Sequence, residues 1–390
     1  MQERIPMKNK KIVITFLVVI VVSIYAEKLQ VSPVEELNII SGIGFDISKE
    51  LNGNVQYSVP FTIYDFKNKS GGASLITRYS KKNGEYIEQS SSIVKAKSSS
   101  IGKTREERQL NSSKSFTIGT ERIAIIGEEQ AYYGIANMVN ILFSNPKINS
   151  RDIFSVCKGK AEDILNFKVK GYASSSDYME GMVRQATDYN FLSTEYDLIN
   201  IFASLNSEGK NLVLPYLEIE ENNIIFTGMT LFKGNKMAYV IPMEESKIMN
   251  MLREKKGKGV LSLQEDPDKY INYDAKVKRK VRCNKIEGKY EFIIDLDFKG
   301  DIIDNTLYKE MNKENESEFE KLMGKKIEKI CYGFLDKMKN VYRIDCLNLG
   351  IYAAAKYGRE TDVDWNEEVS NAEIKVNVNV KIDNMGTGQY

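Results

Sequence analysis

Alternation of apolar and polar residues predicts several β-strands along the chain. The clearest case is 374–382, where isoleucine or valine alternates with lysine or asparagine, as in a half-solvated strand. Residues 55–63 alternate similarly, and Pro60 within them favours an edge position or a bulge. The largely apolar run 37–47 is typical of a buried strand. Strands are therefore expected at both ends of the chain.

Apolar residues spaced three and four apart predict helices between these strands. The strongest helix is expected at about 307–343. Its apolar stripe comprises Phe319, Leu322, Met323, Ile327, Ile330, Phe334, Leu335, Met338 and Val341. A second helix is expected over 128–143, because two glutamates open it and Asn145-Pro146 stops it. Such stripes are usually buried in the core of a domain rather than offered to a partner.

The order of these elements indicates the fold class. The second half begins with a predicted hairpin around the turn 233–236, followed by strands near 259–263, 270–283 and 289–298. Strands and helices do not alternate in regular β-α-β units. The prediction is an α+β fold of two or three domains, with mixed or antiparallel sheets and packed helices, behind an N-terminal hydrophobic signal or anchor.

Polar breaks divide the chain into four predicted segments. Residues 1–26 form the signal or membrane anchor, and 27–206 form an N-terminal region. Residues 207–220 open with the polar break Ser-Glu-Gly-Lys and are predicted to be a linker to the C-terminal region 221–390.

The N-terminal segment combines lysines with an uncharged apolar run. Lys8, Lys10 and Lys11 precede 12–26, which contains no charged residue. This pattern is typical of an export signal, and the run is shorter than the roughly 20 residues that span a bilayer. Cleavage after Ala26 and retention as an anchor both remain open. A buried strand or helix of a cytosolic domain is the alternative, and the flanking lysines argue against it.

The composition excludes several classes of function. The chain has 390 residues and no histidine, so neither a Ser-His-Asp triad nor a His-ligated zinc or haem site is possible. The net charge of +1 hides an anchor of +3 and a remainder of −2. This balance gives no electrostatic footprint for nucleic acid, and no such partner is expected. The four cysteines form no CxxC motif and are predicted to be free and mostly buried.

Two local patterns resemble ligand-binding motifs but lack key residues. Gly42-Ile43-Gly44 lacks the third glycine of a dinucleotide fingerprint, so bulging or close packing is the preferred interpretation. Asp362, Asp364, Asn366 and Glu373 have the spacing of a calcium loop, yet Glu367 stands where that loop needs glycine. No pair of carboxylates can be assigned to acid–base chemistry. The sequence therefore predicts no catalytic, cofactor-binding or metal-binding residue and no cofactor.

Several segments together resemble the Ger(x)C family, the C subunits of bacterial spore germinant receptors. The similar segments, in the order in which that family has them, are 36–38 with 41–46, 118–129, 142–148 with 158–165, 228–236 and 376–382. Each motif is weak alone, and their joint order and spacing make the resemblance specific.

The resemblance implies a non-enzymatic subunit of a nutrient-sensing complex on the outer face of the inner spore membrane. Its implied partners are a membrane-embedded A subunit and a transporter-like B subunit. Family members usually carry an acylated cysteine where this chain has Val31, and the first cysteine here is Cys157. The apolar run 12–26 must then serve as the membrane anchor of a lipoprotein-like chain without the lipidation cysteine.

Two other functions remain open at the level of the sequence. The chain could be an unrelated envelope-anchored protein with its own ligand pocket. It could also be a carboxylate-dependent envelope hydrolase, which would need a cleft holding two carboxylates about 5–9.5 Å apart.

Overall fold

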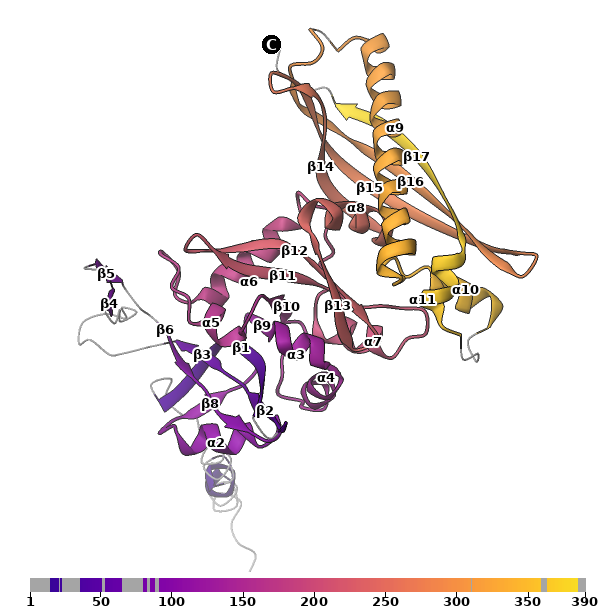
Figure 1. Ribbon diagram of the computed structural model, residues 1–390. Coiled ribbons are helices and arrows are strands. Elements are labelled where there is room, and N and C mark those ends of the chain that lie inside the picture. Colours follow the sequence, from indigo (N-terminus) through magenta and orange to yellow (C-terminus); the bar gives the residue numbers. More distant parts are fainter. Residues whose placement is uncertain are drawn as a thin grey trace, which may run out of the picture.

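Two β-sheets organise the part of the chain that the structure describes. The computed structural model describes residues 15–20, 22, 36–50, 53–64, 80–82, 85–87, 91–309, 311–358 and 363–384. An 11-stranded sheet and a 4-stranded sheet lie within these residues, beside a two-stranded ribbon of β4 (Ser80–Lys82) and β5 (Glu85–Ile87). In Figure 1 the large sheet forms the lower lobe and the small sheet the upper lobe. The expected mixed α+β architecture is confirmed.

Strand β1 (Leu37–Lys49) is the centre of the large sheet because it pairs with four other strands. It runs parallel to β8 (Ser115–Thr117) and β9 (Ile123–Gly127). It runs antiparallel to β2 (Val55–Ser58) and β3 (Phe61–Tyr64). The alternating segment predicted over 55–63 is thus two strands, interrupted where the Pro60 carbonyl accepts a hydrogen bond from the Gly44 N–H at 2.8 Å.

Parallel strands extend the large sheet away from β1. The strand order is β13-β12-β11-β10-β9-β1-β2-β7, with β9, β10 and β11 parallel to one another. Two helical crossovers connect these parallel strands, which the irregular alternation in the sequence did not predict. The remaining strands are β6 (Ser91–Val94), β7 (Lys97–Ser98), β10 (Ile153–Cys157), β11 (Val213–Glu220), β12 (Asn223–Lys233) and β13 (Lys236–Pro242).

The interval expected to be a linker contributes to this sheet. Residues 207–220 include the whole of β11, which pairs with β10 on one side and with β12 on the other. The predicted hairpin of β12 and β13 is present and continues the sheet as far as Pro242.

Helices pack against the large sheet and fill the two crossovers. The helix expected over 128–143 is divided at Gly134, whose φ of +131° breaks the helical backbone. Its two parts are α3 and α4, and α4 packs against α7. The helices of this half are α2 (Thr104–Leu110), α3 (Glu128–Tyr133), α4 (Ala136–Phe143), α5 (Ala161–Leu165), α6 (Ser175–Ala186) and α7 (Leu198–Leu205).

The small sheet is a three-stranded meander completed by the C-terminal strand. Strands β14 (Lys256–Asp266), β15 (Lys269–Ile286) and β16 (Lys289–Asn305) are successively antiparallel. The predicted alternating strand is β17 (Glu373–Asn384), which runs parallel to β16. A parallel neighbour requires a crossover, and helix α9 (Lys313–Lys337) supplies it.

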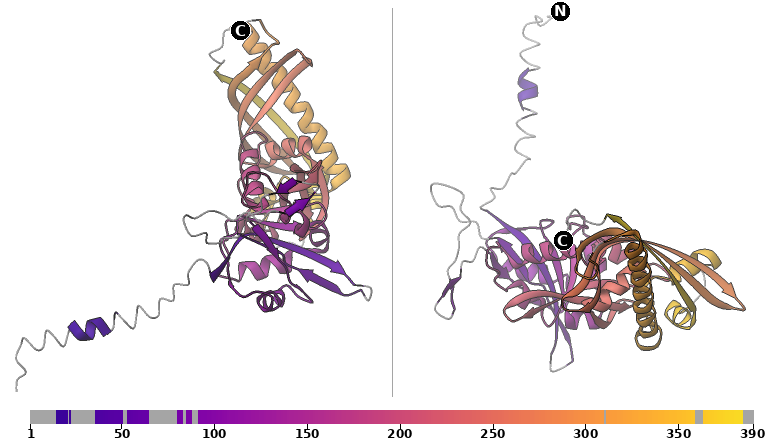
Figure 2. Two further views of the ribbon diagram at one scale, coloured as in Figure 1. Left: turned by 90° about the vertical axis from the view of Figure 1, so that its left-hand side faces the viewer. Right: turned by 90° about the horizontal axis from the view of Figure 1, so that it is seen from above.

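Helix α9 lies along the small sheet, as Figure 2 shows from two further directions. It begins later than expected because the Asn312 side chain accepts hydrogen bonds from the N–H groups of Glu314 and Asn315 and caps the helix. A π-helical turn over Met338–Tyr342 extends it. Most of the predicted apolar stripe is buried, and Leu322 and Val341 are exposed.

The two sheets share one apolar core. Helix α8 (Met243–Arg253) contacts strands of both sheets and also α9. Phe191, from the α6–α7 loop, is fully buried against Gly259 of β14 and lies 6.1 Å, centroid to centroid, from Phe298 of β16. Two short helices, α10 (Gly350–Tyr357) and α11 (Trp365–Asn371), precede β17.

The predicted anchor lies mostly outside the described residues. Residues 15–20 and 22 of the run 12–26 are helical. Among the described residues, no helix is both long and apolar enough to cross a membrane.

Candidate functional site

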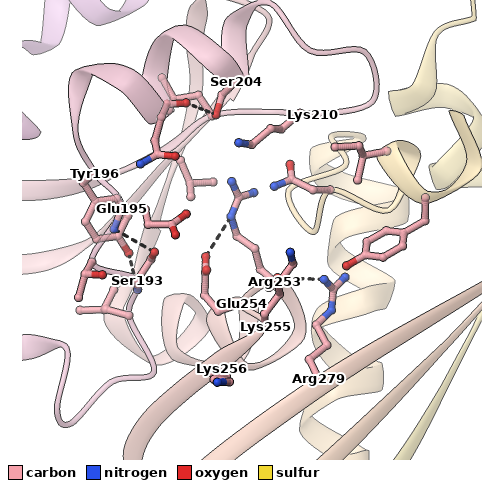
Figure 3. Close-up of a pocket in the computed structure, with 18 residues that line it drawn as sticks. Ser193, Glu195, Tyr196, Ser204, Lys210, Arg253, Glu254, Lys255, Lys256 and Arg279 are labelled. Atoms are coloured by element: carbon pink, nitrogen blue, oxygen red, sulfur yellow. Dashed lines mark hydrogen bonds and ion pairs between the residues drawn. The ribbon is translucent and has the colours of Figure 1, made fainter. Parts of the chain in front are cut away.

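A pocket of about 560 Å³ opens where the two sheets meet. Its walls come from the α6–α7 loop and α7, the segment before β11, the end of α8, β15 and the start of α10. Figure 3 shows the residues around it. They are Leu192, Ser193, Thr194, Glu195, Tyr196, Asn200, Ser204, Lys210, Leu212, Val213, Arg253, Glu254, Lys255, Lys256, Arg279, Asn348, Ile351 and Tyr352.

The segment before β11 closes one side of this pocket by docking on the C-terminal half. Gly209 approaches so closely that an added Cβ would lie 2.4 Å from the carbonyl carbon of Gly350. Its neighbour Glu208 accepts a hydrogen bond from the indole N–H of Trp365 at 2.8 Å. The Asn211 side chain donates to the carbonyl of Asp345 at 3.2 Å. These contacts fix the pocket wall to both halves of the chain.

Two arginines hold the floor of the pocket by binding backbone carbonyls. Arg253, the last residue of α8, donates to the carbonyls of Cys346 at 2.5 Å and Asn211 at 3.0 Å. Its Nε lies 3.3 Å from the Glu254 carboxylate. Arg279 donates to the carbonyls of Arg253 at 3.0 Å and Leu347 at 3.1 Å, which satisfies an orphan acceptor at the end of α8.

A buried aspartate completes this framework beneath the pocket. Asp345 is fully buried and accepts hydrogen bonds from the N–H groups of Leu347, Leu349 and Gly350 at 3.2, 3.0 and 2.7 Å. These bonds order the turn that leads into α10. Burial raises the pKa of Asp345, and the backbone donors together with Arg253 and Arg279 oppose that rise.

Basic groups outnumber acidic groups among the residues that line the pocket. Five are basic and two are acidic, and Figure 3 shows Lys210, Arg253 and Arg279 facing the same space as Glu195 and Glu254. Burial lowers the pKa of Lys210, and the charges of Arg253 and Lys255 lower it further. Burial raises the pKa of Glu254. The site is thus a polar, cation-rich cavity between two lobes.

Gly42 and Gly44, which partly resemble a dinucleotide fingerprint, allow close packing of β1 against its neighbours. A Cβ on Gly42 would lie 2.1 Å from the Ser176 hydroxyl, and one on Gly44 would lie 2.7 Å from Pro60. The register of β1 against β3 also shifts between Ile40 and Gly42. Both the bulge and the close packing inferred from the sequence are therefore confirmed.

The described residues with calcium-loop spacing form capping, hydrogen-bond and ion-pair contacts instead. Asp364 caps α11 by accepting from the N–H groups of Asn366 and Glu367. The Asn366 side chain accepts from Asn211 and from the N–H of Asp345, and Glu373 pairs with Lys375 at 3.2 Å. Asp362 lies outside the described residues. Within the described ranges, no three potential ligands of the His, Cys, Asp and Glu types gather for a metal ion.

The cysteines are confirmed as free and buried. All four, Cys157, Cys283, Cys331 and Cys346, lie in the interior without a disulfide. Burial raises the thiol pKa of each, so they are poor nucleophiles at neutral pH.

Two buried carboxyls in the large sheet have raised pKa values. Asp46 accepts hydrogen bonds from the N–H groups of Ala161 and Glu162 at the start of α5, and burial still raises its pKa to about 6. Burial and the nearby Glu121 raise the pKa of Asp152 to about 8. These groups are far apart in sequence from the pocket residues and are candidates for pH-dependent stability.

Sequence reasoning missed the pocket because no local motif marks it. Its charged residues, such as Lys210, Lys255 and Arg279, come from separate segments and look like ordinary surface positions. The cluster Arg253 to Lys256 was the only signal, and a run of charges normally indicates a solvated face.

Comparisons with known proteins give a consistent match over both halves. Residues 30–219 match the family model described as "Spore germination protein N-terminal domain". Residues 227–386 match the family model described as "Spore germination B3/ GerAC like, C-terminal". The boundary between the two falls beside the turn between β11 and β12, inside the large sheet.

Individual relatives have low sequence identity to this chain, but the matches cover most of its length. The chain is 22% identical over 284 residues to "Spore germination protein GerQC" of Bacillus cereus, covering 70% of this chain and 77% of that protein. It is 22% identical over 276 residues to "Spore germination protein YndF" of Bacillus subtilis (strain 168), covering 68% of each. The crystal structure of the GerBC protein has the same fold, with a TM-score of 0.56, 16% identity, and coverage of 88% of this chain and 97% of that one.

Proposed function

Because the chain belongs to the GerAC-like family of spore germination proteins, and thus has a non-enzymatic role in germination, we propose that it is the C subunit of a nutrient germinant receptor. The observation that carries this proposal is the ordered match of both family models, over residues 30–219 and 227–386. The hydrolase alternative is set aside by this membership. Of the two pocket carboxylates, Glu254 pairs with Arg253 rather than standing free.

The proposed receptor places this subunit at the outer face of the inner spore membrane. Its partners there are a membrane-embedded A subunit and a transporter-like B subunit, and it acts by binding and assembly. Deletion of the gene should abolish or slow the response to at least one nutrient. The full chain purified from spore membranes should bring multi-span subunits with it. Normal germination to every nutrient tested, without co-purifying membrane proteins, contradicts the proposal.

We further propose that residues 12–26 attach the protein to the membrane, since no cysteine precedes Cys157 for lipidation. An aspartate near the centre of a spanning helix costs about 3 kcal/mol on insertion scales. Val19→Asp should therefore move the protein from the membrane fraction of lysed spores to the soluble fraction. Val19→Ile is the matched control and should leave it in the membrane fraction. Equal retention of both variants, or a native protein found soluble without residues 1–26, refutes this anchor.

A further inference from the structure

We propose that the pocket between the two sheets binds a small molecule through its carboxylate or phosphate oxyanion. Its volume of about 560 Å³ lies within the range of about 300–1,000 Å³ typical of small-molecule sites. The pocket also opens at the junction of two lobes, where such sites concentrate. This inference rests on the pocket alone and does not require the receptor assignment.

The charge of the lining selects an anion. Five basic and two acidic residues leave an excess of three positive charges at neutral pH. Glu254 already neutralises part of the charge of Arg253, because its Oε1 lies 3.3 Å from the Arg253 Nε. Lys210 and Lys255 remain: no hydrogen bond or ion pair joins either side chain to another of the described residues. A bound oxyanion would give both a close partner, in addition to the longer-range attraction that Glu195 and Glu254 exert on Lys210.

The arginines retain donors that the protein does not use. A guanidinium group has five N–H donors. The bonds of Arg279 to Arg253 and Leu347 occupy two of them, and its Nε is buried without any partner among the described residues. Only 7% of Arg279 is exposed, so an unsatisfied donor there is costly. Arg279 lines the pocket, and an oxyanion would engage the terminal N–H donors that its two carbonyl bonds leave over, directly or through a bridging water.

The electrostatic state of Lys210 supports the same ligand. Burial lowers its pKa, Arg253 and Lys255 repel its charge, and the attraction of Glu195 and Glu254 only partly offsets these effects. The lowered pKa means that the folded protein holds this ammonium group at a cost in free energy. Binding of an anion would remove the repulsion and stabilise the charged lysine.

The ligand is expected to touch both lobes at once. Lys210 precedes β11 of the large sheet, whereas Arg279 belongs to β15 of the small sheet and Tyr352 to α10. The ring of Tyr352 lies 5.5 Å from the Arg279 guanidinium carbon and forms an apolar wall beside it. A small carboxylate or phosphate ester with a short organic body matches this combination of charge and shape.

Calorimetric titration of the full chain in detergent tests the proposal. The probes are inorganic phosphate and succinate, each titrated in Tris-chloride buffer at constant ionic strength. At least one should bind saturably, with one site per chain, and the one that binds identifies phosphate or carboxylate as the preferred group. Lys210→Met should weaken that binding at least about tenfold, since the loss of one close charge is a 1.4 kcal/mol effect or more.

Matched variants separate binding from folding. Lys269→Met removes an exposed lysine at the start of β15 that does not line the pocket, and it should leave the affinity unchanged. Lys255→Met provides a second pocket variant, because the Lys255 side chain forms no hydrogen bond or ion pair within the part of the chain that the structure describes, and it should also weaken the binding. Failure of both probes to saturate at millimolar concentration overturns the proposal. Equal weakening by Lys210→Met and Lys269→Met overturns it as well.

Discussion

The close approach of Gly209 to α10 gives the sharpest test of how the two lobes are joined. Gly209 has a φ of +69°, and an added Cβ would lie 2.4 Å from the carbonyl carbon of Gly350 and 2.5 Å from the nitrogen of Ile351. The three nearest atoms are all backbone atoms of Gly350 and Ile351, so no flexible side chain can move aside. Gly209→Ala should therefore separate the lobes or strain the backbone where they meet.

A matched glycine isolates that effect. Gly234, in the turn between β12 and β13, has a similar φ of +60°, but nothing lies within 4 Å of its Cβ position. Alanine in the left-handed region costs about 1–2 kcal/mol at either site. Overpacking against fixed atoms adds about 1–3 kcal/mol at Gly209 alone. The expected loss in the free energy of unfolding is thus about 2–5 kcal/mol for Gly209→Ala and about 1–2 kcal/mol for Gly234→Ala.

Urea unfolding of the full chain in detergent measures both variants. Trp365 is the only tryptophan, and its indole N–H binds Glu208 next to Gly209, so its fluorescence reports the contact itself. Far-UV circular dichroism provides a second probe, and coincident transitions justify a two-state treatment. Equal losses in the two variants would show that the lobes are not held together at this point.

Two further predictions concern the buried carboxyl and the long helix. The pKa of Asp46 is raised from 3.8 to about 6, so between these pH values the native state binds more protons than the unfolded state, and stability falls as pH rises. Asp46→Asn should flatten that slope in urea midpoints measured from pH 4 to 7, and an unchanged slope contradicts the assignment. Phe319→Ala should lower the free energy of unfolding by about 3–5 kcal/mol because Phe319, a residue of α9, is fully buried. Leu322→Ala, on the same helix but 42% exposed, should cost less than about 1 kcal/mol, and similar urea midpoints for the two variants would refute this orientation.

Local periodicity predicted the elements whose environment is uniform along their length. Strand β17 and helix α9 each keep one face on the core. Apolar residues therefore recur at every second position in β17 and at every third or fourth position in α9, which is visible in the sequence. The break at Gly134 was not visible because an isolated glycine is compatible with a helix, and its φ of +131° is set by contacts with the β12–β13 turn. Strand β11 was hidden because it follows a polar break that looked like a linker.

The pocket was beyond sequence reasoning for a different reason. Lys210 and Arg279 are separated by many residues, and each lies in a segment with its own structural role. Only the pairing of strands and the docking of Asn211 on Asp345 bring them to one cavity. Without a motif of fixed spacing, charge in the sequence does not reveal where charge gathers in space.

The β12–β13 hairpin prevents the chain from being cut into its two family units. The match to the C-terminal family model starts at residue 227, within β12, and therefore includes most of the hairpin. The strands of the hairpin nevertheless complete the sheet of the N-terminal unit. A fragment ending near residue 220 would leave the edge of the apolar strand β11 unpaired, and such an edge promotes aggregation. The C-terminal fragment would carry two strands without a sheet. Because the β12–β13 hairpin completes the large sheet, the two halves are expected to fold as one unit.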